Sequence, residues 1–101
     1  MKQLLKTLTE TFGPSGYEDE VRKVILKEVK PLADEVRVDA LGNLIVHKKP
    51  AKGSKNPKRI MLAAHMDEIG LMVSHVDEKG FVRFSPLGGV FSKYIHGGRV
   101  R

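Results

Sequence analysis

Residues 60–64 form an uninterrupted apolar run, IMLAA, that leads directly into the polar segment 65–68, HMDE. A short apolar run of this kind is typical of a strand that is covered on both faces. In α/β folds, ligands bind at the carboxyl ends of such central strands. The sequence therefore predicts a central strand over residues 60–64, with a candidate site in the four residues that follow it.

His65 and Asp67 are the candidate site residues of that segment. Side chains alternate along an extended chain, so both should lie on one side with Met66 opposite. A neutral histidine ring nitrogen binds metal ions, and a neighbouring carboxylate can orient the ring or bridge to the ion. The alternative is that His65 caps the strand and Asp67 opens a turn, and the spacing alone does not decide between the two.

Further metal ligands are not evident from the sequence. A catalytic zinc ion usually has three protein ligands. Glu68 should point away from Asp67 in an extended segment, and Asp77 belongs to the turn signal of residues 77–80. The remaining histidines are interpreted as exposed or structural, or have no assigned role: His47, His75 and His96.

Apolar residues recur at helical spacing in two stretches near the start, residues 4–12 and 21–29. The first helix should end at a Gly-Pro pair and the second at Pro31. Ser15 is followed three residues later by Glu18, which is a capping-box pattern for the start of the second helix.

Beyond these helices the apolar period changes to two, which is typical of strands. Residues 36–38 and 44–46 flank a Leu-Gly-Asn turn and predict a hairpin. Residues 69–73 form a second apolar run, again expected to be covered on both faces, and residues 81–84 alternate after a turn. The pattern weakens from residue 86 onward.

The composition excludes several kinds of protein. With 101 residues, of which 41% are hydrophobic, the chain suits one small domain or part of a larger one. Cysteine is absent, which excludes disulfides and thiolate metal sites. No apolar run approaches the ~20 residues of a membrane span, and the start lacks the apolar centre of a signal peptide. We therefore predict a cytoplasmic protein without a membrane partner.

The formal charge of +6 has a local origin. Residues 48–59 carry six basic side chains, no acid, and several Gly, Pro, Ser and Asn residues. This composition predicts a solvated loop. Nucleic-acid binding usually needs a broader basic face with stacking aromatics, so we predict no nucleic-acid partner and keep a small nucleic-acid binder as the least favoured alternative.

Four segments together resemble a known family: FGPSGYE at 12–18, DALGNL at 39–44, AAHMDEIG at 63–70 and the turn at 77–81. Their order resembles that of the M42 metallo-aminopeptidases. The resemblance implies the amino-terminal part of a zinc-peptidase-like (phosphorylase/hydrolase-like) α/β sandwich. Residues 1–80 would belong to the catalytic α/β domain, and residues 81–101 would begin a β-barrel insert domain.

The resemblance also implies an activity: metal-dependent hydrolysis of amino-terminal residues from peptides, by a homo-oligomer. Two divalent ions, zinc or cobalt, would activate a water molecule and polarise the scissile carbonyl. His65 would be a metal ligand, and Asp67 would orient His65. The other ligands and the glutamate base lie later in family members, so this chain is expected to be truncated and inactive alone. The alternative is a catalytically inactive interaction or assembly domain derived from that family.

Overall fold

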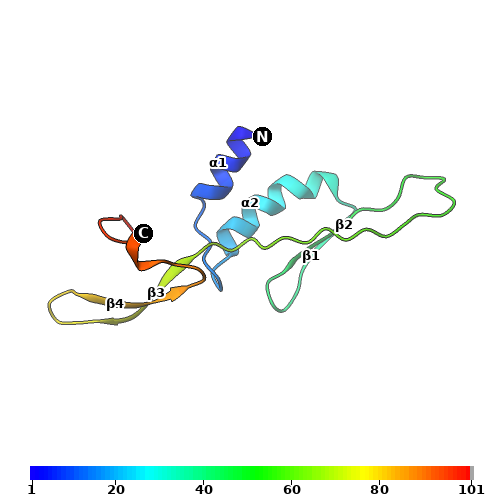
Figure 1. Cartoon of the computed structure of the whole chain (residues 1–101). Helices are drawn as coiled ribbons and strands as arrows, with labels where there is room; N and C mark the ends of the chain where they lie inside the picture. Colours follow the sequence, from blue (N-terminus) through cyan, green and yellow to red (C-terminus); the bar gives the residue numbers. More distant parts are fainter. Residues whose placement is uncertain (101) are drawn as a thin grey trace.

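The computed structural model describes residues 1–100 and begins with two helices, α1 (Lys2–Glu10) and α2 (Asp19–Val29), as the sequence predicts (Figure 1). Helix α1 ends before the Gly-Pro pair because Thr11 adopts an extended conformation, φ −81° and ψ 128°. The amide and hydroxyl of Thr11 both donate to the Thr7 carbonyl and close the last turn. After α2 the chain tightens into a 3₁₀ turn, η1 (Lys30–Leu32), that contains the predicted stop signal Pro31.

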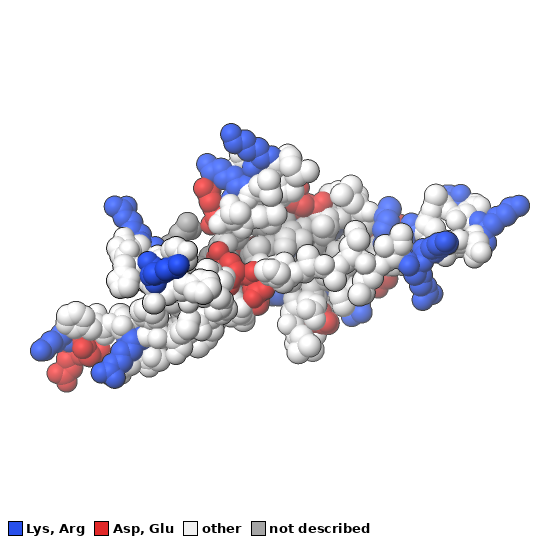
Figure 2. Space-filling view, in the orientation of Figure 1, with Lys and Arg blue, Asp and Glu red and all other residues white. Residues whose placement is uncertain are grey.

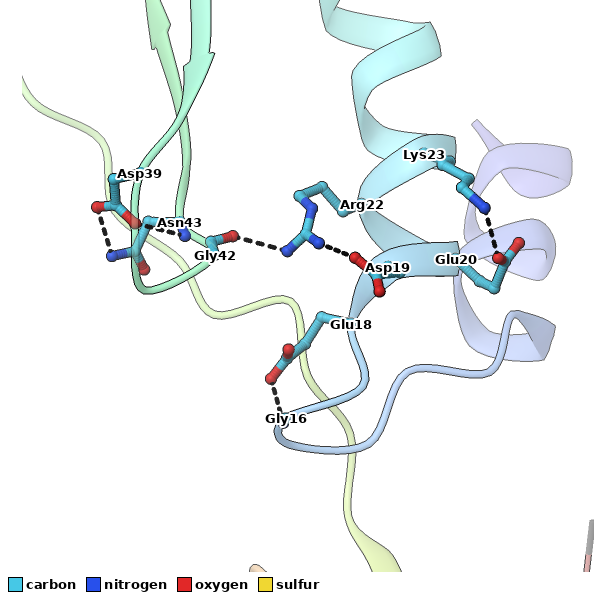
Figure 3. Close-up of polar contacts among 9 residues, drawn as sticks. All are labelled: Gly16, Glu18, Asp19, Glu20, Arg22, Lys23, Asp39, Gly42 and Asn43. Carbon is cyan, nitrogen blue, oxygen red and sulfur yellow. Dashed lines mark hydrogen bonds and ion pairs between the residues drawn. The ribbon is translucent and has the colours of Figure 1, made fainter.

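The predicted capping box at Ser15 is wrong. Glu18 is the N-cap residue of α2, and no side chain makes a capping hydrogen bond there. The Glu18 carboxylate instead accepts the Gly16 amide at 2.6 Å (Figure 3). The Ser15 hydroxyl donates to Asp67, 52 residues away, because the loop between α1 and α2 folds against that segment. A partner distant in the sequence thus replaces the local one.

The predicted first hairpin is confirmed. Strands β1 (Glu35–Val38) and β2 (Leu44–His47) pair antiparallel, with Val36 opposite Val46. Gly42 occupies the turn at φ +86°, a left-handed conformation that glycine adopts without a steric penalty. The Asp39 carboxylate closes the turn by accepting hydrogen bonds from the amide and the side chain of Asn43 (Figure 3). It also accepts the Leu41 amide.

A second hairpin joins β3 (Gly70–Val76) and β4 (Val82–Leu87), also antiparallel, around the predicted turn. The Asp77 carboxylate accepts the Lys79 and Phe81 amides and so holds this turn. Both faces of this hairpin are largely exposed, so the expectation that residues 69–73 are covered on both faces is wrong. The predicted domain boundary at residue 80 falls within this turn, and the division into two domains stays a prediction.

The predicted central strand over residues 60–64 is not formed. The segment crosses the molecule as extended chain without strand pairing, and Ile60, Met61 and Leu62 are 84%, 87% and 93% exposed (Figure 1). Within the described part of the chain, residues 60–66 make no backbone–backbone hydrogen bond. A covered strand needs neighbours on both edges and layers on both faces. Among residues 1–100 no strand pairs with this segment, and its apolar side chains are left uncovered.

The basic segment 48–59 is the solvated loop that its composition predicts. It contains neither helix nor strand, and every residue in it is exposed. Figure 2 shows Lys and Arg side chains gathered at the right-hand end of the molecule, where this loop follows β2 in Figure 1. Near its base, Lys48 lies 3.4 Å from the Asp34 carboxylate.

Among residues 1–100 the one buried hydrophobic side chain is that of Val21 of α2, which is 4% exposed, and Gly13, which lies against it, is also buried. The radius of gyration is 18.7 Å, whereas a compact domain of this length has about 13 Å. The β3–β4 hairpin extends to one side of the helices and the 48–59 loop extends to the other, and together they give the chain its length of 67 Å (Figure 1). After β4 come a short 3₁₀ turn, η2 (Ser92–Tyr94), and an edge-to-face pair of Phe91 and Tyr94. None of the described helices is both long and apolar enough to cross a bilayer.

Candidate functional site

His65 and Asp67 contact each other, as their spacing predicts. The ring nitrogen Nδ1 of His65 lies 3.0 Å from Asp67 Oδ1 and 3.0 Å from the Asp67 carbonyl oxygen. An ionised carboxylate and a carbonyl can only accept hydrogen bonds, so Nδ1 carries the proton and donates. The His65 side chain is 85% exposed, which leaves Nε2 as the nitrogen with an available lone pair.

The Asp67 carboxylate has a second partner on its other oxygen. The Ser15 hydroxyl donates to Asp67 Oδ2 at 2.5 Å. This hydrogen bond is the largest cause of a lowered pKa of Asp67, and the hydrogen bond with His65 lowers the pKa further. Both interactions favour the ionised form of Asp67.

Gly13 and Glu68 hold the loop between the helices against the site. The Glu68 amide donates to the Gly13 carbonyl at 2.9 Å, and the Gly13 amide donates to Glu68 Oε1 at 3.2 Å. Pro14 and Glu68 form an isolated parallel bridge. The Glu68 side chain is thus engaged with the loop, whereas Asp67 is shared between Ser15 and His65.

A small open hollow of about 140 Å³ lies beside His65. One wall is the segment 64–67, and the other is formed by the turn of the first hairpin together with Glu18. Arg22 fixes that turn, because its Nη1 donates to the Gly42 carbonyl at 2.9 Å while Nη2 pairs with Asp19 (Figure 3). Helix α2 therefore positions the hairpin wall opposite the histidine.

The other candidates do not join this site. Asp77 is committed to its turn, and the remaining histidines are exposed: His47, His75 and His96. No group of three or more His, Asp or Glu side chains among residues 1–100 could hold a metal ion. His65 is suited to be one ligand of a metal ion, because the Asp67 carboxylate holds Nδ1–H and Nε2 is available to bind the ion. The described residues do not complete a metal site, so no reaction step through a metal follows from them.

Sequence comparison places this arrangement in a family. The profile described as M42 glutamyl aminopeptidase matches residues 42–101, which include His65 and Asp67. The chain belongs to the M42 glutamyl aminopeptidase family. A second profile, described as AMPT, matches residues 1–25. The M42 match continues through residues 90–101, where the sequence pattern weakens.

Individual relatives agree with this assignment. The chain is 45% identical over 100 residues to lysyl aminopeptidase of Pyrococcus furiosus, covering 98% of this chain and 28% of that protein. It superposes on aminopeptidase APDkam598 of Desulfurococcus kamchatkensis with a TM-score of 0.81 and 43% identity, over 90% of this chain and 24% of the other. The dodecameric structure PhTET1-12s gives a TM-score of 0.74 and 41% identity, over 90% and 26%. The chain thus spans less than a third of the length of the curated relatives it matches.

These structural matches show that the two helices and the two antiparallel hairpins of this chain share the α/β fold of the M42 relatives. Sequence reasoning predicts that His65 and Asp67 lie on one side of their segment, but it does not predict the contacts that Gly13 and Ser15 make with residues 67–68. The FGPSG segment marks their position, yet nothing in its local pattern indicates a partner 52 residues away.

Proposed function

We propose that this chain contributes the first metal-ligand segment of a metal-dependent aminopeptidase that removes amino-terminal residues from peptides. The observation that carries the proposal is the His65–Asp67 contact, which lies within the segment that matches the M42 family. The carboxylate holds Nδ1–H and leaves Nε2 available, and this is the usual arrangement of a metal-binding histidine.

In this proposal His65 is a ligand of one of two divalent ions, zinc or cobalt, and Asp67 orients it. When bound, the ions would polarise the scissile carbonyl and activate a water molecule. The chain's own contribution is to hold a neutral imidazole with its proton on Nδ1. In this proposal the peptide terminus would reach His65 through the hollow beside it.

Substrate and assembly are further parts of the proposal. A relative at 45% identity is named lysyl aminopeptidase, and PhTET1-12s is a dodecamer. We propose that the complete protein acts on peptides with a free amino terminus and that it forms a homo-oligomer. A cytoplasmic location belongs to the same proposal.

A chimera tests this function. Residues 1–101 of this chain replace the matching segment of Pyrococcus furiosus lysyl aminopeptidase, which supplies the rest of the protein. We expect the chimera, with added zinc or cobalt, to hydrolyse a lysyl chromogenic substrate. His65→Ala should abolish the activity, whereas His96→Ala, which alters an exposed histidine outside the site, should retain it. A chimera that assembles like its parent but is inactive, or whose activity survives His65→Ala, would contradict the proposal.

One observation favours the second candidate, an inactive interaction or assembly domain. The apolar residues 60–62 are highly exposed and unpaired, as expected of a surface that meets another chain. Size-exclusion chromatography with light scattering on the chain alone tests this candidate. A discrete stoichiometric assembly, combined with an inactive but folded chimera, would favour it over the aminopeptidase.

A further inference from the structure

The Ser15 hydroxyl is the one described side chain besides His65 that forms a hydrogen bond with the Asp67 carboxylate. The two contacts use different oxygens, since Ser15 donates to Oδ2 at 2.5 Å and His65 donates to Oδ1 at 3.0 Å. Ser15, Asp67 and His65 therefore form a continuous hydrogen-bonded series that starts in the loop between the helices and ends at the candidate ligand.

This arrangement matters because a carboxylate rotates easily. The terminal torsion of aspartate is broad and roughly two-fold, so a single contact does not fix the plane of the group. Asp67 is also about one-third exposed, and water competes for its oxygens. A second donor on Oδ2 restricts the rotation and keeps Oδ1 directed at the histidine.

The Ser15 backbone is itself held in place. Two amide contacts join Gly13 to Glu68, and Pro14 approaches Gly70 so closely that a Cβ there would lie 2.9 Å from Pro14 Cβ. Directly after Ser15, Gly16 turns the chain at φ +87° toward α2. The docked loop thus places the Ser15 hydroxyl next to Asp67, a residue that it contacts only in the folded chain.

We propose that Ser15 is a positioning residue that fixes the plane of the Asp67 carboxylate and, through it, the Nδ1–H tautomer and ring orientation of His65. The use of this tautomer to leave Nε2 available for a metal ion rests on the proposed function. The tautomer itself does not, because it is a property of the metal-free chain.

The test is the tautomeric state of His65 in the 15N-labelled 101-residue chain, read from the ring nitrogen shifts at a pH above the histidine titration range. We expect Nδ1–H to dominate in the parent chain. Ser15→Ala should lose this preference, and Ser15→Thr, which keeps a hydroxyl, should retain it. His47, His75 and His96 serve as internal references in the same spectra and should not change.

A shape-matched pair keeps the test decisive if Ser15→Ala disturbs the loop. Thr and Val have nearly the same shape and differ by the hydroxyl, so Ser15→Thr should keep the Nδ1–H tautomer and Ser15→Val should lose it. An unchanged His65 tautomer in Ser15→Ala or in Ser15→Val would overturn the proposal. An inactive chimera with the expected tautomer changes would count against the proposed function alone.

Discussion

Arg22 and Gly42 are joined by a hydrogen bond of 2.9 Å from the guanidinium Nη1 to the carbonyl oxygen. The contact links helix α2 to the turn of the first hairpin, 20 residues later. Because that turn lines the hollow beside His65, the bond sets one wall of the candidate site. By holding this turn in place, the contact determines how open the hollow beside His65 is.

Arg22→Ala should release the turn from α2. A hydrogen bond to a charged donor contributes about 1.5–3 kcal/mol, and the Arg22 side chain is largely covered, so the loss should be measurable as faster amide exchange in the turn. The matched control is Lys23→Ala, which removes an exposed pair with Glu20 one residue along the helix and should leave the turn unchanged. Equal exchange rates in parent and Arg22→Ala would contradict the expectation.

Asp39 should make the same turn sensitive to acid. Its pKa is lowered, first by the Asn43 side chain and then by the backbone amides of Asn43 and Leu41. Because the folded-state pKa is lowered, the stabilisation that the ionised Asp39 carboxylate gives to the turn is fully present above the ordinary aspartate pKa of about 3.9. It is lost as the pH falls through the lower folded-state pKa. Protection of the Leu41 and Asn43 amides should therefore persist to about pH 4 and disappear below it. In Asp39→Asn, which does not titrate, that acid step should be absent.

Gly13→Ala should destabilise the packing of the loop on α2. A Cβ at this position would lie 2.7 Å from Val21 Cγ1, and Val21 is the most buried apolar side chain among residues 1–100. Overpacking of this kind costs about 1–3 kcal/mol. The melting of the helical circular dichroism signal should shift to lower temperature. Gly89→Ala is the control, because a Cβ there meets nothing within 4 Å and the backbone is not left-handed.

The features that the sequence predicts correctly depend on local signals. Both helices follow from apolar spacing, and both hairpins follow from turns with a left-handed glycine, Gly42 and Gly80. The prediction of a covered strand at 60–64 was wrong because burial depends on which elements pack against the run. The apolar run itself does not contain that information. Ser15 was misassigned for the same reason. Its local partner Glu18 completes a pattern, whereas its actual partner Asp67 becomes adjacent only after the loop has docked.

The exposed apolar segment should control self-association of the chain. Leu62 is 93% exposed in unpaired extended chain, so Leu62→Glu should not disturb the monomer but should weaken association at high concentration. Light scattering over a concentration series measures the effect. Leu41→Glu is the matched control, because Leu41 is 89% exposed but lies in a hairpin turn outside this segment. Equal effects of the two variants would show that general surface charge, and not the segment, governs association.

In the chimera, Asp67→Asn should weaken the response to metal more than it weakens folding. The substitution keeps the shape of the side chain but removes the charge that supports Nδ1–H of His65. Loss of such a partner typically lowers metal affinity or activity about 10–100-fold, so the zinc or cobalt concentration needed for half-maximal activity should rise by that factor. Asp77→Asn provides the comparison, since Asp77 also accepts local hydrogen bonds but closes a distant turn. If both variants required the same metal concentration as the unmodified chimera, the orienting role of Asp67 would have to be abandoned, even with His65 retained as a ligand.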